Sequence, residues 1–165
     1  MERKVFDVKS SAKAPYCVLS NFHPNAFVLD GVVCASMEGF LQSLKTRNIA
    51  EQERICLLCG KDAKNYFKNR IENAVWKLTG VLWWRGRAYR RDSDEYQRLL
   101  DRVYLALSKN PTFREALLGT RGEALIHTIG KRRTGKTVLT EYELISRLIR
   151  LRNRLVREER FKNGK

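Results

Sequence analysis

The fold is decided by the segment Ser36-Met37-Glu38-Gly39-Phe40-Leu41-Gln42-Ser43-Leu44-Lys45, which reads as an amphipathic helix with a defined start. Ser36 is a suitable N-cap, because a serine hydroxyl accepts a hydrogen bond from a free N–H group of the first helical turn. The pattern predicts a helix from Ser36 to about Arg47. Four apolar side chains recur at helical spacing and share one face that we expect to be buried: Met37, Phe40, Leu41 and Leu44.

A polar strip runs beside this apolar face. Glu38, Gln42 and Lys45 recur at i, i+4 and i+7, so their side chains line up along the helix. A carboxylate, an amide and an ammonium group at the margin of a core are suited to the floor of a cleft. The same spacing also fits a salt-bridged strip on the surface, and the spacing alone leaves both interpretations open.

Turns and capping residues divide the rest of the chain into short elements. Asp30-Gly31 predicts a hairpin turn between extended pieces in residues 15–34. After the deciding helix, the pattern predicts a helix from Asn48 to about Cys59 and another over residues 61–71. It then predicts a turn-rich stretch around residues 83–86, helices over 92–108, 111–119 and 140–160, and a strand over 124–129. Because helices dominate without regular strand alternation, we predict an α+β fold, a mostly helical single domain with a small β-sheet over residues 1–165.

The charge balance points to an anionic partner. Lysine and arginine total 33 against 18 acidic residues in a chain of 165, so the formal net charge is +15. This excess repels itself in a compact domain, which favours nucleic acid, a nucleotide or an anionic membrane surface as partner. Apolar runs such as Val81-Leu82-Trp83-Trp84 are far shorter than the roughly 18 residues of a membrane span, and the charged start is unlike a secretory signal. We therefore expect a soluble, cytoplasmic protein that does not associate with membranes.

The cysteines offer little for metal or redox chemistry. Cys56 and Cys59 form a C-x-x-C pair, but Cys17 and Cys34 stand apart, whereas structural zinc sites usually join two close pairs. Zinc binding and redox chemistry stay open as alternatives. We expect buried, reduced thiols, no metal site and no cofactor.

A second motif lies near the C-terminal helix. The stretch Gly130-Lys131-Arg132-Arg133-Thr134-Gly135-Lys136-Thr137 matches the G-x-x-x-x-G-K-[ST] pattern of phosphate-binding loops. Too few residues follow Thr137 to supply the further strands and the magnesium-positioning aspartate of a nucleotide hydrolase. Such loops also favour small residues where Lys131, Arg132 and Arg133 stand. The motif therefore favours a basic loop that contacts phosphates over a nucleotide hydrolase.

Basic residues also recur on the last predicted helix, opposite its leucine face: Arg147, Arg150, Arg154 and Arg157. Two interpretations are open. The arginines form a solvated helix face, or they form a track for a polyanion, with Trp83 or Trp84 stacking on a base.

Three segments, in this order, resemble the signature of the NADAR family, also called YbiA-like: Leu19-Ser20-Asn21-Phe22, Phe27-Val28-Leu29-Asp30-Gly31, and the segment from Ser36 to Lys45. That family typically shows S-N-F, a short D-G hairpin and S-x-E-H-Y-F-Q-A-x-K. Further on, residues 110–120 resemble one of its helices, and Leu151-Arg152-Asn153-Arg154-Leu155 matches its closing L-R-x-x-L. The resemblance spans residues 19–155 and implies a YbiA-like fold.

The resemblance also implies N-glycosidase chemistry on a ribose attached to a base-like nitrogen. Family substrates are phosphorylated ribosylamino intermediates of riboflavin synthesis and ADP-ribose placed on guanine bases by toxins. The family's signature positions fall on Glu38, Asn21, Gln42 and Lys45. Two features depart from its pattern: Gly39 replaces a histidine, and a later D-x-x-W-G segment with a following asparagine is absent, its place being taken by residues 128–141.

The roles of these residues follow from the reaction. Cleavage of an N-ribosyl bond passes through an oxocarbenium-like ribose, so the site needs negative charge near the anomeric carbon. We expect Glu38 to supply that charge or to activate water, and Lys45 to polarise the leaving group, to pair with Glu38, or to act as an amine nucleophile. The expected substrate-binding residues are Asn21, Phe22, Gln42, Trp84, Gly130 and Lys131. The expected phosphate- or nucleic-acid-binding residues are Arg132, Arg133, Lys136, Arg147, Arg150 and Arg154.

Three functions are compatible with these expectations. The first, favoured by the charge of +15, is an N-glycosidase that removes ADP-ribose from guanine in DNA or RNA. The second is an N-glycosidase that acts on riboflavin-pathway intermediates. The third is a non-catalytic module that binds ADP-ribose or nucleic acid, which the absent segment favours. The expected partners are accordingly ADP-ribosylated nucleic acid or a phosphorylated ribosyl metabolite, and a cognate ADP-ribosylating toxin.

Overall fold

The deciding segment forms helix α1 (Met37–Ser43) in a computed structural model, which describes residues 3–164. The predicted cap is present, because the Ser36 hydroxyl accepts a hydrogen bond from the Gly39 N–H group at 3.0 Å. All four predicted apolar side chains of α1 are at most 2% exposed. The helix ends earlier than predicted, at Ser43, because the carbonyl of Leu44 accepts a hydrogen bond from Trp83 on a neighbouring strand at 2.8 Å instead of continuing the helix.

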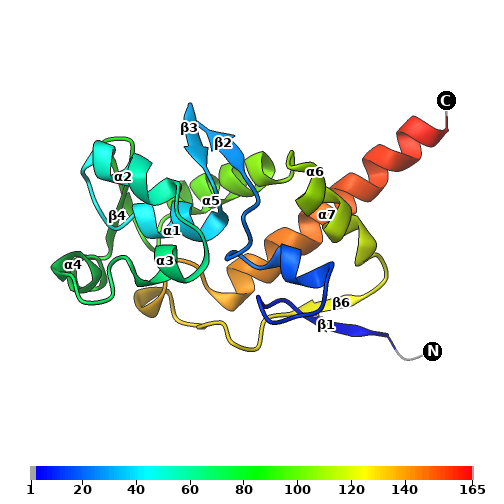
Figure 1. Ribbon diagram of the computed structural model, residues 1–165, viewed down its shortest axis with the longest axis horizontal. Helices are drawn as coiled ribbons and strands as arrows, with labels where there is room; N and C mark the ends of the chain where they lie inside the picture. The colour runs from blue at the N-terminus through cyan, green and yellow to red at the C-terminus, as the bar shows by residue number, and fades with distance from the viewer. Residues whose placement is uncertain (1–2, 165) are drawn as a thin grey trace.

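Six further helices in the described residues follow α1 along the chain (Figure 1). They are α2 (Ile49–Cys56), α3 (Gly60–Asn65), α4 (Ile71–Thr79), α5 (Asp94–Leu107), α6 (Pro111–Gly119) and α7 (Glu141–Asn163), with short 3-10 turns at Tyr16–Leu19 and Thr134–Lys136. Asn48 and Asn110 cap α2 and α6, and Thr140 and Glu143 form a capping box at the start of α7. Helix α5 begins at Asp94, two residues later than predicted, with Ser93 as its cap.

The predicted small β-sheet is divided into three separate two-stranded sheets. Strands β2 (Phe27–Leu29) and β3 (Val32–Cys34) form the predicted hairpin, and Asp30 and Gly31 in its turn have positive φ angles of 49° and 78°. Strands β1 (Val5–Asp7) and β6 (Ala124–Ile126) pair in parallel. Strands β4 (Val81–Trp84) and β5 (Arg87–Arg90) form a second hairpin. The fold is therefore α+β, as predicted, and helices supply most of it.

Two predictions between residues 59 and 90 were wrong. A single helix over 61–71 was expected, but α3 ends at Asn65 and α4 starts at Ile71, with the buried side chain of Phe67 between them. The stretch around 83–86 was expected to be a turn-rich region, whereas only Arg85 and Gly86 form a turn, between β4 and β5.

Helix α2 also stops earlier than predicted, at Cys56 rather than Cys59. The carbonyl of Cys56 accepts a hydrogen bond from the Ala35 N–H group at 2.8 Å, and the carbonyl of Leu58 accepts one from the Ser36 hydroxyl at 2.8 Å. These contacts with the residues just before α1 replace the hydrogen bonds that would have continued α2.

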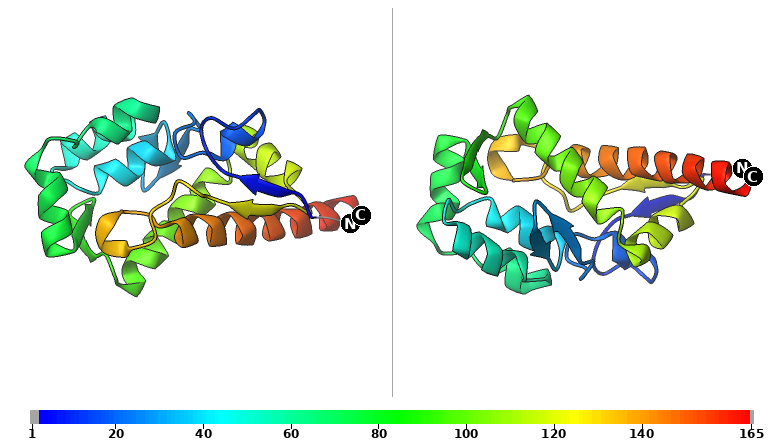
Figure 2. Two further views of the ribbon diagram at one scale, coloured as in Figure 1. Left: turned by 90° about the horizontal axis from the view of Figure 1, so that it is seen from below. Right: turned by 90° about the horizontal axis from the view of Figure 1, so that it is seen from above.

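The elements form two layers that are joined at one end of the molecule. Figure 2 shows α1, α2 and α3 in one layer and α7 with β6 in the other, with α4 and the β4–β5 hairpin at the end where the layers meet. The loop that leads from β6 into α7 faces α1 across this end. None of the helices in residues 3–164 combines the length and apolar character needed to cross a membrane.

The loop between β6 and α7 differs from a phosphate-binding loop. In that motif the helix begins at the G-K-[ST] residues, whereas α7 begins at Glu141, after Thr137 and three further residues. The four cysteines are free thiols: Cys34 and Cys56 are buried, as predicted, whereas Cys17 and Cys59 are partly exposed.

Candidate active site

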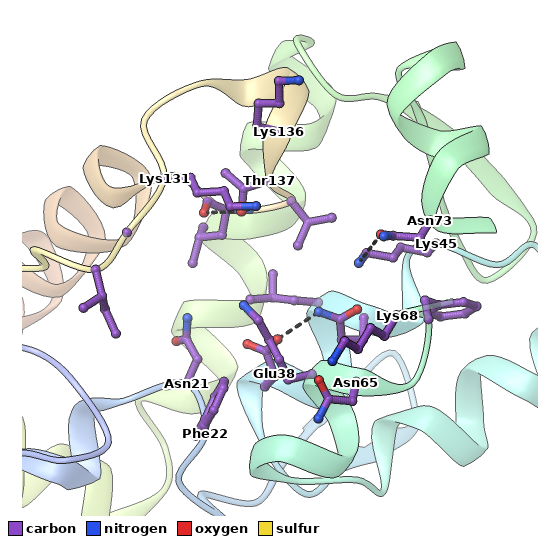
Figure 3. Close-up of a pocket in the computed structure, with 18 of the residues that line it drawn as sticks. Asn21, Phe22, Glu38, Lys45, Asn65, Lys68, Asn73, Lys131, Lys136 and Thr137 are labelled. Carbon is purple, nitrogen blue, oxygen red and sulfur yellow. Dashed lines mark hydrogen bonds between the residues drawn. The ribbon is translucent and has the colours of Figure 1, made fainter. Parts of the chain in front are cut away.

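A cavity of about 440 Å³ lies between α1, α3, α4 and the segment 127–139 (Figure 3). Eight of the predicted site residues line it: Asn21, Phe22, Glu38, Gln42, Lys45, Gly130, Lys131 and Lys136. These residues come from three distant parts of the sequence. The fold therefore brings together the segments on which the sequence resemblance rests.

Glu38 lies on the floor of this cavity. Its side chain is 6% exposed, and its carboxylate Oε1 accepts a hydrogen bond from Gln42 Nε2 at 2.8 Å, one helical turn away. Its backbone N–H donates to the Asn21 carbonyl at 2.9 Å, which ties the start of α1 to the segment before the first hairpin. The polar strip predicted on α1 is thus part of a cavity floor and not a salt-bridged surface.

The side-chain amide of Gln42 uses its NH2 group in a hydrogen bond, whereas its oxygen has no partner among the described residues. Because Nε2 donates to Glu38, the amide orientation is fixed, and Oε1 finds no hydrogen-bond partner among the described residues. The side chain is 4% exposed. A buried carbonyl oxygen without a donor costs about 1–3 kcal/mol, so a ligand that brings an O–H or N–H group to Gln42 relieves that cost.

Asn21 is held by a buried tyrosine. The Tyr104 hydroxyl donates to Asn21 Oδ1 at 3.2 Å, and burial raises the pKa of Tyr104, so this hydroxyl stays a donor at any physiological pH. With Oδ1 occupied, the amide N–H group of Asn21 faces the cavity as a donor. Phe22 follows it and adds an apolar surface to the wall, beside Glu38 (Figure 3).

Lys45 occupies the other side of the cavity from Asn21 (Figure 3). Its Nζ donates to Asn73 Oδ1 at 3.0 Å. Burial lowers the pKa of Lys45 to about 8; the charge of Glu38 opposes this shift, and the nearby lysines 77, 64 and 131 add to it. Lys45 is therefore an amine that exchanges its proton near neutral pH, a property required of a catalytic lysine.

The cavity is strongly cationic. Six lysines line it, the half-buried Lys45 and five exposed ones: Lys64, Lys68, Lys77, Lys131 and Lys136. None of the six forms a salt bridge within the described residues, and Glu38 is the one carboxylate among the described lining residues. A cleft lined mainly by charges of one sign concentrates the electric field, so the cavity attracts anions. Among the described lining residues, the negative charge is that of Glu38 on the floor.

Two glycines at the site allow close backbone contacts. At Gly39 there is no room for a side chain, because a Cβ atom would lie 2.6 Å from the carbonyl oxygen of Leu58. The histidine that the family pattern has at this position would therefore not fit on this backbone. At Gly130, a Cβ atom would lie 2.4 Å from the ring of His127, whose Nδ1 donates to the Val8 carbonyl at 2.6 Å. The backbone of Gly130 can therefore pack closely against His127 at the cavity wall.

Trp84 was predicted to bind substrate, and this prediction was wrong. Its side chain is 2% exposed, packs edge-to-face on Phe40 with 5.0 Å between ring centres, and donates from Nε1 to Asp30 Oδ2 at 2.8 Å. Trp84 belongs to the core. Sequence reasoning missed Trp76 and Asn73 of α4, which do line the cavity. Their signal is the spacing of Asn73, Trp76 and Lys77 at i, i+3 and i+4, which places them on one helix face.

The arginines predicted to form a track on α7 do not line the cavity, and only Arg147 among them is buried. Arg147 is 5% exposed, because it faces α5, where it bonds to Gln97 and its Nε lies 3.0 Å from Asp101. Arg150 pairs with Asp101 as well, and Arg154 pairs with Glu158. In the preceding loop Arg132 pairs with Glu141, whereas Arg133 is exposed. The cations that line the cavity are lysines.

Comparisons with known proteins agree with this geometry. A family model described as "Bacteriophage protein GP30.3" matches residues 13–153. An uncharacterised 17.1 kDa protein from the Gp30–rIII intergenic region of Enterobacteria phage T4 is 36% identical over 151 residues, which are 90% of this chain and 97% of that protein. The NMR structure of the E. coli protein YbiA has the same fold, with a TM-score of 0.60 at 18% identity over 96% of this chain and 89% of YbiA. The chain therefore belongs to the bacteriophage GP30.3 family, a NADAR-type family with the YbiA fold.

Proposed function

We propose that the protein is an N-glycosidase that hydrolyses the bond between a ribose and a base nitrogen, and that its substrate is nucleic acid carrying ADP-ribose on guanine. The observation that carries the proposal is the position of Glu38, a lone carboxylate on the floor of a cavity with six lysines. This arrangement provides negative charge at one point for a ribosyl cation and positive charge around it for phosphates.

In the proposed reaction the C1–N bond of the ribose breaks, its electron pair leaves with the base, and a water oxygen bonds to C1 while one proton of that water passes to Glu38. Glu38 stabilises the positive charge that develops on the ribose. Lys45 protonates or polarises the departing nitrogen, which requires an amine whose pKa is lowered, as that of Lys45 is. Gln42 Oε1 accepts a hydrogen bond from a ribose hydroxyl, and Asn21 donates to an acceptor of the ribose or of the base.

The lysines at the cavity mouth bind the phosphates of the substrate. Lys131 and Lys136 come from the loop before α7, and Lys64 and Lys68 come from α3 and the turn after it. Because these charges are exposed and lack acidic partners, a diphosphate gains their attraction without breaking existing salt bridges. An ADP-ribosylating toxin that modifies guanine would supply this substrate and is the partner that belongs to the proposal.

The test is release of ADP-ribose from a DNA oligonucleotide that carries it on one guanine, followed by mass spectrometry. We expect the wild-type protein to restore the unmodified oligonucleotide and the Glu38→Gln variant to lose about 30-fold to 1,000-fold in turnover. Cleavage of phosphorylated ribosylamino metabolites, with the oligonucleotide left intact, would replace this substrate by the small-molecule one. Binding of the oligonucleotide without cleavage of either substrate would show a binding module.

A further inference from the structure

We infer that Asn73, on α4, is a positioning residue that holds the Lys45 amine at the cavity wall through a neutral hydrogen bond. The inference rests on the proposed function, in which Lys45 acts on the leaving group. Neither the sequence pattern nor the resemblance pointed to Asn73. It lines the same cavity as Glu38 and stands opposite Asn21 and Phe22 (Figure 3).

The hydrogen bonds around Asn73 fix its amide in one orientation. Asn73 Oδ1 accepts from Lys45 Nζ at 3.0 Å and from Trp76 Nε1 at 3.4 Å. Trp76 is 2% exposed, so the surrounding core holds its indole ring. Since an indole N–H group can only donate, it keeps the oxygen of Asn73, rather than the nitrogen, on the side of Lys45.

Lys45 needs such a partner because the charges around it act in different directions: Glu38 attracts its amine, and three lysines repel it. The nearby lysines 64, 77 and 131 carry like charges, and a lysine side chain has about 2 kcal/mol of rotamer entropy to lose. Without an acceptor on α4, the amine would have several positions in the cavity. One hydrogen bond of ordinary length restricts it to the wall beside Trp76, whose ring centre lies 6.0 Å from Nζ.

The neutrality of Asn73 is as important as its geometry. An amide oxygen accepts a hydrogen bond from an ammonium group and from a neutral amine alike, so it restrains Lys45 without locking the proton onto it. A carboxylate at the same place would favour the charged form by direct attraction. Asn73 therefore allows a pKa of about 8 for Lys45 while keeping its nitrogen in place.

The test compares two nearly isosteric changes, Asn73→Asp and Asn73→Leu, with Asn69→Asp as the control. Asn69 is exposed, precedes α4 and does not line the cavity, so its change adds the same charge without the contact. The first readout needs no substrate: acetylation of Lys45 by an amine-reactive reagent is followed from pH 6 to pH 11 by peptide mass spectrometry. The second readout is turnover of the ADP-ribosylated oligonucleotide over the same pH range.

We expect Asn73→Asp to raise the pKa of Lys45 by about one to two units, which lowers its labelling at pH 8 about 5- to 50-fold. The pH at which turnover is maximal should rise with it. Asn73→Leu should keep Lys45 reactive near pH 8 but lower kcat about 10- to 100-fold with little change in KM, because an unrestrained amine is misplaced. Asn69→Asp should leave both profiles as in the wild type.

A labelling profile for Asn73→Asp that matches Asn69→Asp would overturn the inference. If Asn73→Asp does not fold, as judged by circular dichroism, Trp76→Phe replaces it: this variant keeps an aromatic ring and removes the N–H group that orients Asn73 together with part of the indole ring. We expect it to lower kcat in the same direction as Asn73→Leu, and unchanged kcat would contradict the inference. If the wild type is inactive but the labelling shifts appear as expected, the proposed function is rejected. The positioning of Lys45 by Asn73 then still stands.

Discussion

Replacement of Glu38 by glutamine tests the charge on the cavity floor with little change in shape. The amide oxygen of the new side chain can still accept the hydrogen bond from Gln42, so the end of the side chain keeps its place. The change removes only the negative charge. A unit positive charge about 4 Å from a carboxylate is stabilised by about 4 kcal/mol at an effective dielectric constant of about 20, and a half-developed charge by about 2 kcal/mol.

These energies correspond to a loss of about 30-fold to 1,000-fold in kcat for Glu38→Gln, since about 1.4 kcal/mol is tenfold. The assay is single-turnover release of ADP-ribose from the modified oligonucleotide. A second consequence follows, because the charge of Glu38 raises the pKa of Lys45. In the variant, Lys45 should react with amine reagents at lower pH. Turnover within about threefold of the wild type, with this labelling shift present, would refute the role of Glu38 in the chemistry.

Three further changes test the fold and the cavity mouth. Gly39→Ala should destabilise the protein by about 1–3 kcal/mol in urea unfolding, because its methyl group meets backbone carbonyls that cannot move freely. Lys131→Ala combined with Lys136→Ala should weaken binding of the modified oligonucleotide at least tenfold and flatten its salt dependence, measured by fluorescence anisotropy; an unchanged salt slope would argue against phosphate contacts there. Burial alone would raise the pKa of Glu143, but its hydrogen bonds, above all those from Arg91, outweigh burial and lower it. The stability that Glu143 contributes is therefore present above about pH 4.5 and is lost as the pH falls through the lower folded-state pKa. The Glu143→Gln variant should lack this acid dependence in unfolding curves. It should also lower the free energy of unfolding at pH 7 by about 3–5 kcal/mol.

The starts of helices could be predicted from the sequence because a cap acts over three or four residues. Ser36, Asn110 and Thr140 each accept a hydrogen bond from an N–H group three positions on, so local sequence contains the whole interaction. The helix ends were predicted less well. The carbonyl of Leu44, for example, finds its partner on Trp83, and no local pattern indicates that contact.

The difference between local and long-range contacts also explains which residues of the site were predicted and which were missed. Glu38 and Gln42 were predicted because they lie on one helix whose buried face was evident. Trp84 was assigned wrongly because its direction depends on the register of the β4–β5 hairpin, in which alternate side chains point inward. Asn73 was missed because its partner, Lys45, lies just after α1, far from α4 in the sequence. The two side chains come into contact only in the folded chain.

The net charge of +15 indicates an anionic partner, but only the folded protein shows which of the cations are paired with carboxylates and which are not. In the described residues, twelve arginines and one lysine, Lys9, form salt bridges. The planar guanidinium group suits this use, because it fits the two oxygens of a carboxylate. The lysines of the cavity remain unpaired. A track of arginines along α7 would have bound a polyanion over a long surface, whereas unpaired lysines around one carboxylate concentrate the attraction at the cavity mouth. This concentration of positive charge supports the proposed function, because in ADP-ribose the phosphates lie close to the sugar that would react.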